Sequence, residues 1–332
     1  MNIRVFAILS FLLAIPVCAE KLSMLSLKPN ESVSKLSASG DVLAVAVNYR
    51  EEYQLGKKIS ELRNDSAIAF YRNNELIEYT PFKNGVIRSV IPLDTGFFVT
   101  RVLYDENAHA LAEFFLATPC QEVIELPSLE VDPMGAWVDD EEIIYVYSSR
   151  AVYYCSKDNM IWKEMKINAS VGSEAIRKLI TIDTGMSLIA TDRVIKVFED
   201  LKNEPVFIKK SGSYPDPIKV FGNSDTWWIV NSCKGLCRIN ILSPKGDFSE
   251  IEGPEGVNIK DILFSEDSAF IVCSRLGGNP HKYGYYIIKK DDFDSMKGPY
   301  RLPDDTMIVT LWNDKIVSGG DGNRIWFDEV KE

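Results

Sequence analysis

The chain has 332 residues, of which 46% are hydrophobic and 26% are charged, and this composition argues against a disordered or low-complexity protein. Its net charge of −11 at pH 7 argues against nucleic acid as a partner, because nucleic-acid binding depends on Lys and Arg side chains that neutralise phosphates. An acidic surface suits either simple solubility or a basic protein partner, and both alternatives stay open.

Residues 1–19 predict a signal peptide. Arg4 supplies a positive charge, residues 5–15 form an apolar core, and residues 16–19 give a break followed by small residues. The apolar core is shorter than the roughly 20 residues that a membrane-spanning helix needs, and no later segment reaches that length. We therefore expect an exported protein, periplasmic or secreted, in which residues 20–332 form one domain. Acylation of Cys18 is the alternative, which the bulky Val17 before it disfavours.

An internal repeat is the most informative feature that follows. The segment IRKLITIDTGMSLIAT at residues 176–191 echoes IRSVIPLDTGFFVT at residues 87–100. Weaker copies, each with a following aspartate, begin at Ser34, Met134, Ile218, Ile259 and Met307. The seven starts lie 41 to 53 residues apart, which is the period of four-stranded propeller blades. We predict that the recurrent aspartate makes the turn from the first strand to the second.

The remaining signals predict strands that complete these units. Short runs of Val, Ile, Tyr, Phe and Trp alternate with Asn, Asp, Gly and Pro along the chain. Six four-stranded units fit between Ser34 and Pro299, whereas residues 307–330 hold only three strands. Residues 22–27 are predicted to add the fourth strand, which would close a ring and cover its exposed edges.

On this repeat, the chain resembles a seven-bladed β-propeller, an all-β fold whose last blade is closed by the mature N-terminal strand. The units lack the Trp-Asp pair of WD40 blades and the double glycine of kelch blades, so the resemblance indicates no family within the fold. Within the fifth unit, we expect one ring of Trp227-Trp228 to pack between blades and the other to face outward.

Asp-Thr-Gly at residues 94–96 and 183–185 is similar to the paired motif of pepsin-like aspartic proteases, in which two carboxylates share a proton. The two copies lie about two repeat periods apart, and the Ser or Thr that normally follows the glycine is replaced by Phe97 and Met186. The pattern therefore favours turns over a catalytic pair.

Other catalytic signals are weak. The only histidines are His109 and His281, and the chain has no motif of a serine hydrolase, a zinc protease or a phosphate-binding loop. We expect no catalytic residue, no metal and no cofactor. The alternative is a hydrolase or lyase whose carboxylates or metal lie at the propeller channel, since propellers host both binding proteins and enzymes.

Five cysteines follow the predicted signal peptide: Cys120, Cys155, Cys233, Cys237 and Cys273. Export would place them in an oxidising compartment. Cys233 and Cys237 flank the tip of a predicted hairpin, and we expect them to form a disulfide that contributes about 2 kcal/mol. The odd count leaves at least one thiol, most simply a buried one such as Cys273.

Two predicted loops between second and third strands are long, residues 49–66 in the first unit and residues 274–283 in the sixth. In a closed ring of seven they flank the seventh unit from either side. Long loops on a rigid scaffold often carry binding residues, and Tyr and Arg are enriched at interface hot spots. The predicted binding patch comprises Tyr49, Arg50, Tyr53, Arg63, Arg275, His281, Tyr283, Asp321 and Asn323. Tolerated insertions in surface loops are the alternative.

These observations predict a monomeric, exported, non-enzymatic binding protein that contacts a protein partner through the face bearing the long loops. A concrete version is an immunity protein that blocks a secreted toxin, and the acidic charge would suit a basic target. We expect no nucleic-acid partner and no membrane span.

Overall fold

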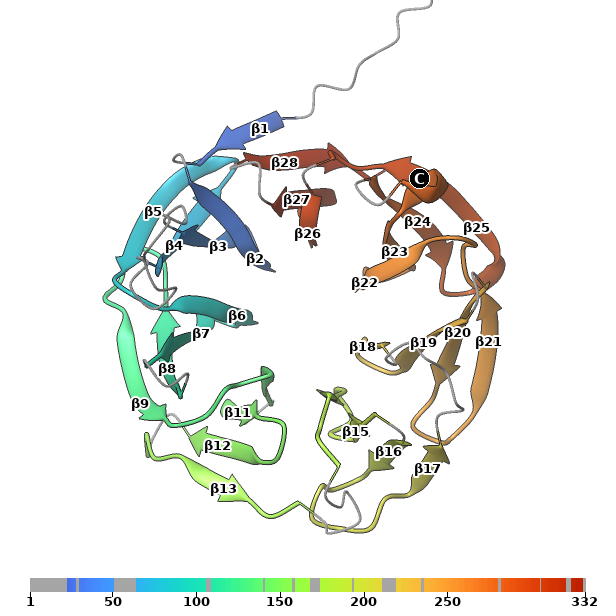
Figure 1. Ribbon diagram of the computed structural model, residues 1–332, viewed down its shortest axis with the longest axis horizontal. Helices are drawn as coiled ribbons and strands as arrows, with labels where there is room; N and C mark the ends of the chain where they lie inside the picture. Colours follow the sequence, from blue (N-terminus) through green and yellow to red (C-terminus); the bar gives the residue numbers. More distant parts are fainter. Residues whose placement is uncertain are drawn as a thin grey trace, which may run out of the picture.

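The protein is an all-β ring in which seven sheets are arranged around a common central axis, and we call the region along this axis the channel (Figure 1). The computed structural model describes residues 23–27, 30–50, 64–105, 109–139, 141–156, 159–167, 174–192, 194–210, 219–233, 236–279, 282–304, 306–320 and 324–330. Within these residues the strands form seven four-stranded antiparallel sheets, so the predicted seven-bladed β-propeller is confirmed. No helix in the described part is long and apolar enough to cross a membrane.

The first three blades follow the chain in order, each running from the inner strand to the outer strand. Blade 1 is β2 (Glu31–Ser39), β3 (Val42–Arg50), β4 (Asn64–Arg72) and β5 (Glu75–Phe82); blade 2 is β6 (Val86–Leu93), β7 (Gly96–Tyr104), β8 (Ala110–Ala117) and β9 (Ile124–Leu129); blade 3 is β10 (Gly135–Val138), β11 (Ile143–Tyr147), β12 (Val152–Ser156) and β13 (Lys163–Met165).

The next three blades repeat this order. Blade 4 is β14 (Lys178–Thr181), β15 (Ser187–Ala190), β16 (Val194–Phe198) and β17 (Phe207–Lys210); blade 5 is β18 (Lys219–Gly222), β19 (Trp227–Cys233), β20 (Leu236–Leu242) and β21 (Phe248–Glu252); blade 6 is β22 (Asn258–Phe264), β23 (Ser268–Ser274), β24 (Tyr283–Lys289) and β25 (Asp292–Arg301).

Blade 7 is assembled from both ends of the chain. It contains β26 (Thr306–Trp312), β27 (Lys315–Gly320), β28 (Arg324–Glu329) and, as its outermost strand, β1 (Ser23–Ser26). β1 runs antiparallel to β28, with Ser23 opposite Phe327 and Ser26 opposite Arg324. β1 therefore occupies the place predicted for residues 22–27, as the fourth strand of the last blade.

Burial follows the position of a strand within its blade. All four residues of β15, a second strand, are buried, because neighbouring blades pack on both faces of the sheet. The outer strand β5, in contrast, has no buried residue: three of its eight residues are exposed and five are half-buried. The core therefore lies in seven interfaces between adjacent blades.

The tryptophan pair of β19 illustrates this packing. Trp227 packs among residues of blades 4 and 5, and Trp228 packs among residues of blades 5 and 6. Their exposed fractions are 0% and 1%. The expectation that one ring faces outward is wrong, because successive side chains of a strand point to opposite faces and both faces of β19 are covered.

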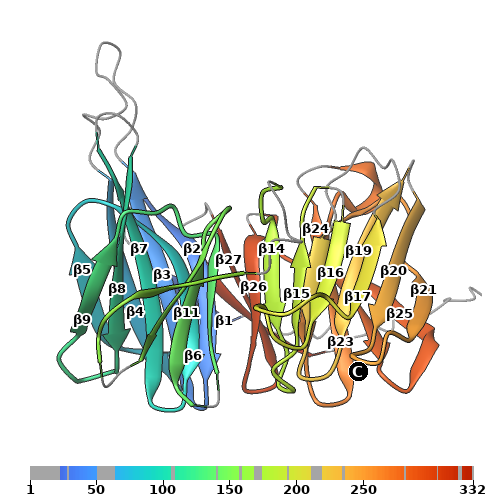
Figure 2. The same ribbon diagram turned by 90° about the horizontal axis from the view of Figure 1, so that it is seen from below.

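The ring has two faces, seen edge-on in Figure 2. At the turn face, the first strand of each blade turns into the second. At the loop face, the second strand turns into the third, and the chain passes to the next blade. Asp94 and Asp183 lie in the inner turns of blades 2 and 4, with blade 3 between them, so they are turn residues as predicted and cannot share a proton.

Four inner strands carry an irregularity at matching positions. The register shifts between Val33 and Lys35 in β2, Ile87 and Ser89 in β6, Ile259 and Asp261 in β22, and Thr306 and Ile308 in β26. A β-bulge adds one residue to a strand and re-aims the side chains beside it. These shifts coincide with the starts of the sequence repeat, so the repeat encodes both the inner turn and a bulge near the loop face.

Candidate binding surface and central channel

The described members of the predicted patch lie on the loop face. Tyr49 stands near the end of β3, Arg275 follows β23, and Tyr283 begins β24. They belong to blades 1 and 6, which lie on either side of blade 7 (Figure 1). The two halves of the patch therefore share one face. Tyr53, Arg63, His281, Asp321, Asn323 and the side chain of Arg50 lie outside the described residues, so their part in the patch stays a prediction.

A short ordered loop presents Arg275. Arg275 adopts a left-handed conformation, with φ 66° and ψ 31°, at the start of the 3-10 helix η3 (Leu276–Gly278). A non-glycine residue in this conformation is strained and persists only when its surroundings fix it. Buried Leu276 provides that fixation, because its N–H donates to the carbonyl oxygen of Lys282 at 3.2 Å. The exposed Arg275 side chain therefore projects from a pre-organised loop.

Gly284 makes room for the anchor of this loop. A Cβ atom at this position would lie 2.4 Å from Cδ1 of Leu276 and 2.4 Å from the carbonyl oxygen of Tyr300. Neither distance is compatible with a side chain. The glycine thus allows Leu276 to pack against β24, and this packing holds the Arg275 loop in place.

The loop-face half of the channel contains several basic side chains. Lys35 on β2, Arg88 on β6 and Lys178 on β14 come from inner strands and are exposed. The strand partner of Lys35 is Ala46, at the middle of β3, and the partner of Lys178 is Ala190, the last residue of β15 at the loop face. Arg88 belongs to an apolar-basic dipeptide that opens several repeat units, whereas Lys35 and Lys178 lie outside this dipeptide and carry no such mark in the sequence.

The roles within this dipeptide are divided. Ile87, Ile176 and Ile259 have exposed fractions of 1% to 2% and pack between blades. The following residues, Arg88, Arg177 and Lys260, are exposed. Arg177 forms an ion pair with Asp192, with Nε 2.7 Å from Oδ1. The isoleucine therefore belongs to the core, and the basic residue belongs to the channel or its mouth.

Three charged groups in the channel influence one another across the ring: Lys35, Lys178 and Asp261, which we call the channel cluster. Surrounding protein limits the hydration of Lys35 and lowers its pKa; Lys178 and Arg88 lower it further, and Asp261 raises it. Limited hydration also lowers the pKa of Lys178, against the effect of Asp261. The members come from blades 1, 4 and 6, so the side chains converge from different sides of the channel.

Asp261 is the carboxylate of this cluster. Limited hydration raises its pKa, whereas the N–H of Ile262, which donates to Oδ1 at 2.9 Å, and the two lysines lower it. Among the ion pairs of the described residues, none joins two members of the channel cluster. Two ammonium groups and one carboxylate thus share the channel without direct contact.

A cavity of about 550 Å³ opens beside Lys35 between blades 1, 2 and 3. Polar lining residues include Ser34, Asn48 and Ser89, together with Arg88. Arg88 donates a hydrogen bond to the hydroxyl of Tyr104, and its Nη2 lies 3.9 Å from Oδ1 of Asp132. The charge of Arg88 is therefore partly offset by Asp132, whereas no described carboxylate forms an ion pair with Lys35.

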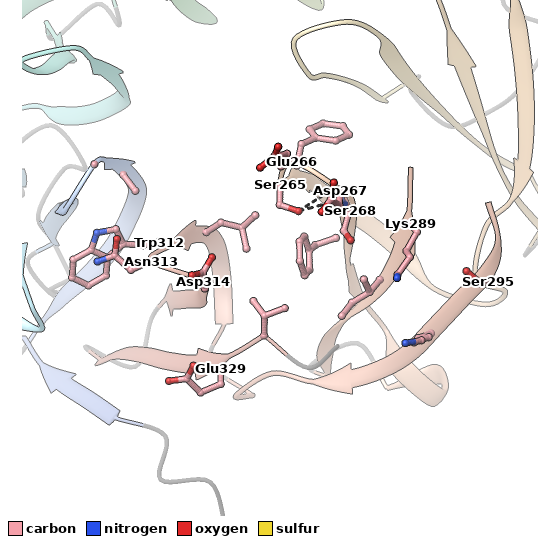
Figure 3. Close-up of a pocket in the computed structure, with 18 residues that line it drawn as sticks. Ser265, Glu266, Asp267, Ser268, Lys289, Ser295, Trp312, Asn313, Asp314 and Glu329 are labelled. Atoms are coloured by element: carbon pink, nitrogen blue, oxygen red, sulfur yellow. Dashed lines mark hydrogen bonds between the residues drawn. The ribbon is translucent and has the colours of Figure 1, made fainter. Parts of the chain in front are cut away.

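The turn face has a different character. A groove of about 870 Å³ runs between blades 6 and 7 and the inner turn of blade 1. In Figure 3, Glu266 and Asp267 from blade 6 and Asp314 from blade 7 lie around this groove, with Lys289 at its outer side. Every inner turn carries a carboxylate: Asp41, Asp94, Asp139, Asp183, Asp225, Asp267 and Asp314. The acidic turns and the predicted patch thus lie on opposite faces.

No protein-family model and no curated protein sequence matches the chain. Many solved structures do. Virginiamycin B lyase from Staphylococcus aureus is 11% identical, with a TM-score of 0.57 over 92% of this chain and 98% of that one. The β-propeller domain of the Trilobed protease from Pyrococcus furiosus is 9% identical, with a TM-score of 0.61 over 89% and 95%.

A chain of the Mitotic Checkpoint Complex is 12% identical, with a TM-score of 0.58 over all of both chains. The likeness is one of fold. At these identities it extends to no activity, since one propeller fold hosts both enzymes and binding proteins.

The described residues contain no group of three His, Cys, Asp or Glu side chains placed to hold a metal ion. His109 is 79% exposed on the loop face of blade 2, and its Nδ1 lies 3.0 Å from Oδ2 of Asp105. This pair lies beside a separate concavity of the loop face and not in the channel.

The described cysteines differ in access. Cys155 and Cys273 are buried thiols, as expected for Cys273, and Cys120 is an exposed thiol. Burial raises the pKa of Cys273 to about 12. The register places Cys233 opposite Leu236 and Cys237 opposite Ser232, so the two cysteines occupy neighbouring rungs. The side chain of Cys233 lies outside the described residues, and the disulfide stays a prediction.

Alkylation should separate these thiols. At about pH 8, a maleimide is expected to modify Cys120 in the folded protein and to reach Cys155 and Cys273 only after unfolding, because a buried thiol ionises poorly and is inaccessible. Peptide mass spectrometry would measure the modified fraction at each site. Equal rates at Cys120 and Cys273 would contradict the packing between blades 5 and 6. Modification of both Cys233 and Cys237 after unfolding without reductant would exclude their disulfide.

Proposed function

We propose that this chain is an exported, non-enzymatic binding protein that holds a protein partner on its loop face, over blades 6, 7 and 1. The observation that supports this most directly is the Arg275 loop. An exposed arginine stands there in a strained conformation that Leu276 and Gly284 maintain. Pre-organisation of this kind lowers the entropic cost of association, and Arg is among the residues enriched at hot spots.

The charge around the proposed surface bears on the partner. Arg275 and the basic mouth of the channel would favour a partner surface that offers carboxylates. A basic partner, such as the toxin of an immunity pair, would find complementary charge on the acidic turn face instead. The proposal therefore makes the loop face the binding face and the turn face the competing one.

A lyase that acts at the channel is the second candidate. Titratable groups with shifted pKa values that gather in a cleft are frequent at active sites, and the channel cluster is such a group. Virginiamycin B lyase has a similar fold. A glycoside hydrolase has less support. It needs two facing carboxylates, whereas the channel cluster contains one carboxylate, that of Asp261.

Affinity capture from the native compartment would test the proposed function. Arg275→Glu is expected to weaken capture of the partner at least about tenfold, because a hot-spot arginine contributes 1.4 kcal/mol or more. Arg72→Glu is the matched control, since Arg72 is a half-exposed arginine at the turn-face end of β4.

A third variant, Asp267→Asn with Asp314→Asn, reduces the charge of the turn face. Loss of capture with Arg275→Glu alone supports the proposal. Loss with the turn-face variant alone contradicts it and supports a basic partner on the other face. Capture that no variant changes also contradicts it.

A further inference from the structure

The channel cluster presents a charge arrangement that the core of the fold does not need. Lys35, Lys178 and Asp261 stand on the inner strands of blades 1, 4 and 6; the two lysines are exposed and Asp261 is half-buried. Lys35 and Lys178 repel each other across the channel, and Asp261 offsets only one of the two charges. This unbalanced positive charge stands inside a chain whose net charge is −11.

Unbalanced charge of one sign in a concave, protein-walled space attracts counter-ions strongly, because the low-dielectric walls focus the field. An ammonium group has three N–H donors and no acceptor, so each lysine can donate to a ligand oxygen. The two lysines form no ion pair with described carboxylates, and their donors therefore remain available to a ligand.

The adjoining cavity adds polar side chains and room. It holds about 550 Å³ and is lined by Ser34, Ser89, Asn48 and Arg88 in addition to Lys35. Ser34 and Arg88 occupy the bulges of β2 and β6, where one residue of the strand is left out of the ladder. The Ser34 hydroxyl donates to the carbonyl oxygen of Ala46 at 3.2 Å, and Oδ1 of Asn48 accepts from the N–H of Ile87 at 3.2 Å, so the protein itself positions the polar groups near Lys35.

We propose that the loop-face half of the channel binds a small oxyanion with two or more negative charges, of the phosphate or dicarboxylate class, between Lys35 and Lys178. Two ammonium groups on different sides of the channel suit a ligand with two anionic oxygens better than a ligand with a single anionic oxygen. Asp261 would accept a hydrogen bond from a hydroxyl or a protonated oxygen of the ligand. It would disfavour ligands that have no such donor. This inference does not depend on the Arg275 surface and goes beyond the proposed function.

The test uses the full chain and two probes, inorganic phosphate and succinate, each titrated by calorimetry at constant ionic strength against sodium chloride. Lys35→Met and Lys178→Met keep the length of the side chain and remove the charge. Each is expected to weaken binding roughly 10- to 100-fold, the range for losing a hydrogen bond to a charged group. Lys163→Met is the matched control, an exposed lysine on the outer strand β13.

The melting temperature measured without ligand shows whether each variant is still folded. Both substitutions relieve repulsion in the channel, so each variant is expected to melt at the same temperature as the wild type or higher. Binding of either probe that both channel variants lose and Lys163→Met retains supports the proposal, and the preferred probe identifies the ligand class. No binding beyond chloride, or equal binding by wild type and channel variants, overturns it.

Discussion

A chain that begins at Asn30 is expected to unfold at a clearly lower denaturant concentration than a chain that begins at Ser23. The shorter chain lacks β1, which is the outermost strand of blade 7 and pairs with β28 over four residues. Each ladder hydrogen bond contributes about 1 kcal/mol net, so the loss should amount to about 2–4 kcal/mol. The bare edge of β28 would also offer a template for pairing between molecules.

Urea unfolding followed by circular dichroism would measure the first effect, and size-exclusion chromatography at several concentrations would measure the second. Leu25→Pro in the longer chain serves as a milder version, because proline cannot donate to the ladder. Equal unfolding midpoints and a monomeric short chain would show that packing between β2 and blade 7 closes the ring alone.

The ring could be predicted from the sequence because its signals are local and repeated. The aspartate of each unit, as in Asp94 and Asp183, marks a turn whose chemistry does not depend on distant residues. The closure followed from counting, since three C-terminal strands needed a fourth and residues 22–27 were the remaining candidate. Both predictions agree with the observed pairing.

The patch could be predicted only in part. Counting the blades correctly placed Tyr49 and Arg275 on one face, on either side of blade 7. The conformation of Arg275, in contrast, depends on Leu276 and on the space that Gly284 leaves beside it. Such contacts join strands β23 and β24 in three dimensions, and no periodic pattern reports them.

The channel cluster was missed for a similar reason. Lys35, Lys178 and Asp261 are far apart in the sequence, and each looks like an ordinary exposed strand residue. Only ring closure brings them around a common axis. The β-bulges contribute as well, because a one-residue shift changes which side chains of an inner strand face the channel, and a bulge leaves no clear mark on hydrophobic periodicity.

Trp228 shows that a correctly predicted strand can still lead to a wrong prediction of side-chain exposure. Alternation predicted opposite faces for Trp227 and Trp228, and the structure agrees. Alternation separates buried from exposed positions only when one face of the sheet meets water. In a propeller, the second strand of a blade is covered on both sides, so both rings are buried.

Trp228→Ala is accordingly expected to lower the free energy of unfolding by about 3–5 kcal/mol, the usual cost of removing a buried aromatic side chain. Trp228 is 1% exposed, and its ring centroid lies 5.4 Å from that of Phe264 and 6.2 Å from that of Phe293. Its Nε1–H donates to Oγ1 of Thr226 at 3.3 Å. The substitution would therefore leave a cavity between blades 5 and 6 that neither sheet can close without losing its register.

Phe248→Ala provides the comparison, because Phe248 lies on the outer strand β21 of the same blade and is 38% exposed. Its ring centroid lies 5.4 Å from that of Phe207. Removal of this half-exposed ring should lower the free energy of unfolding by only about 1 kcal/mol. Guanidinium unfolding of both variants, followed by circular dichroism, gives the two free energies. If Trp228→Ala costs no more than Phe248→Ala, the interface between blades 5 and 6 can repack around the missing ring, and its stability does not depend on the fit seen here.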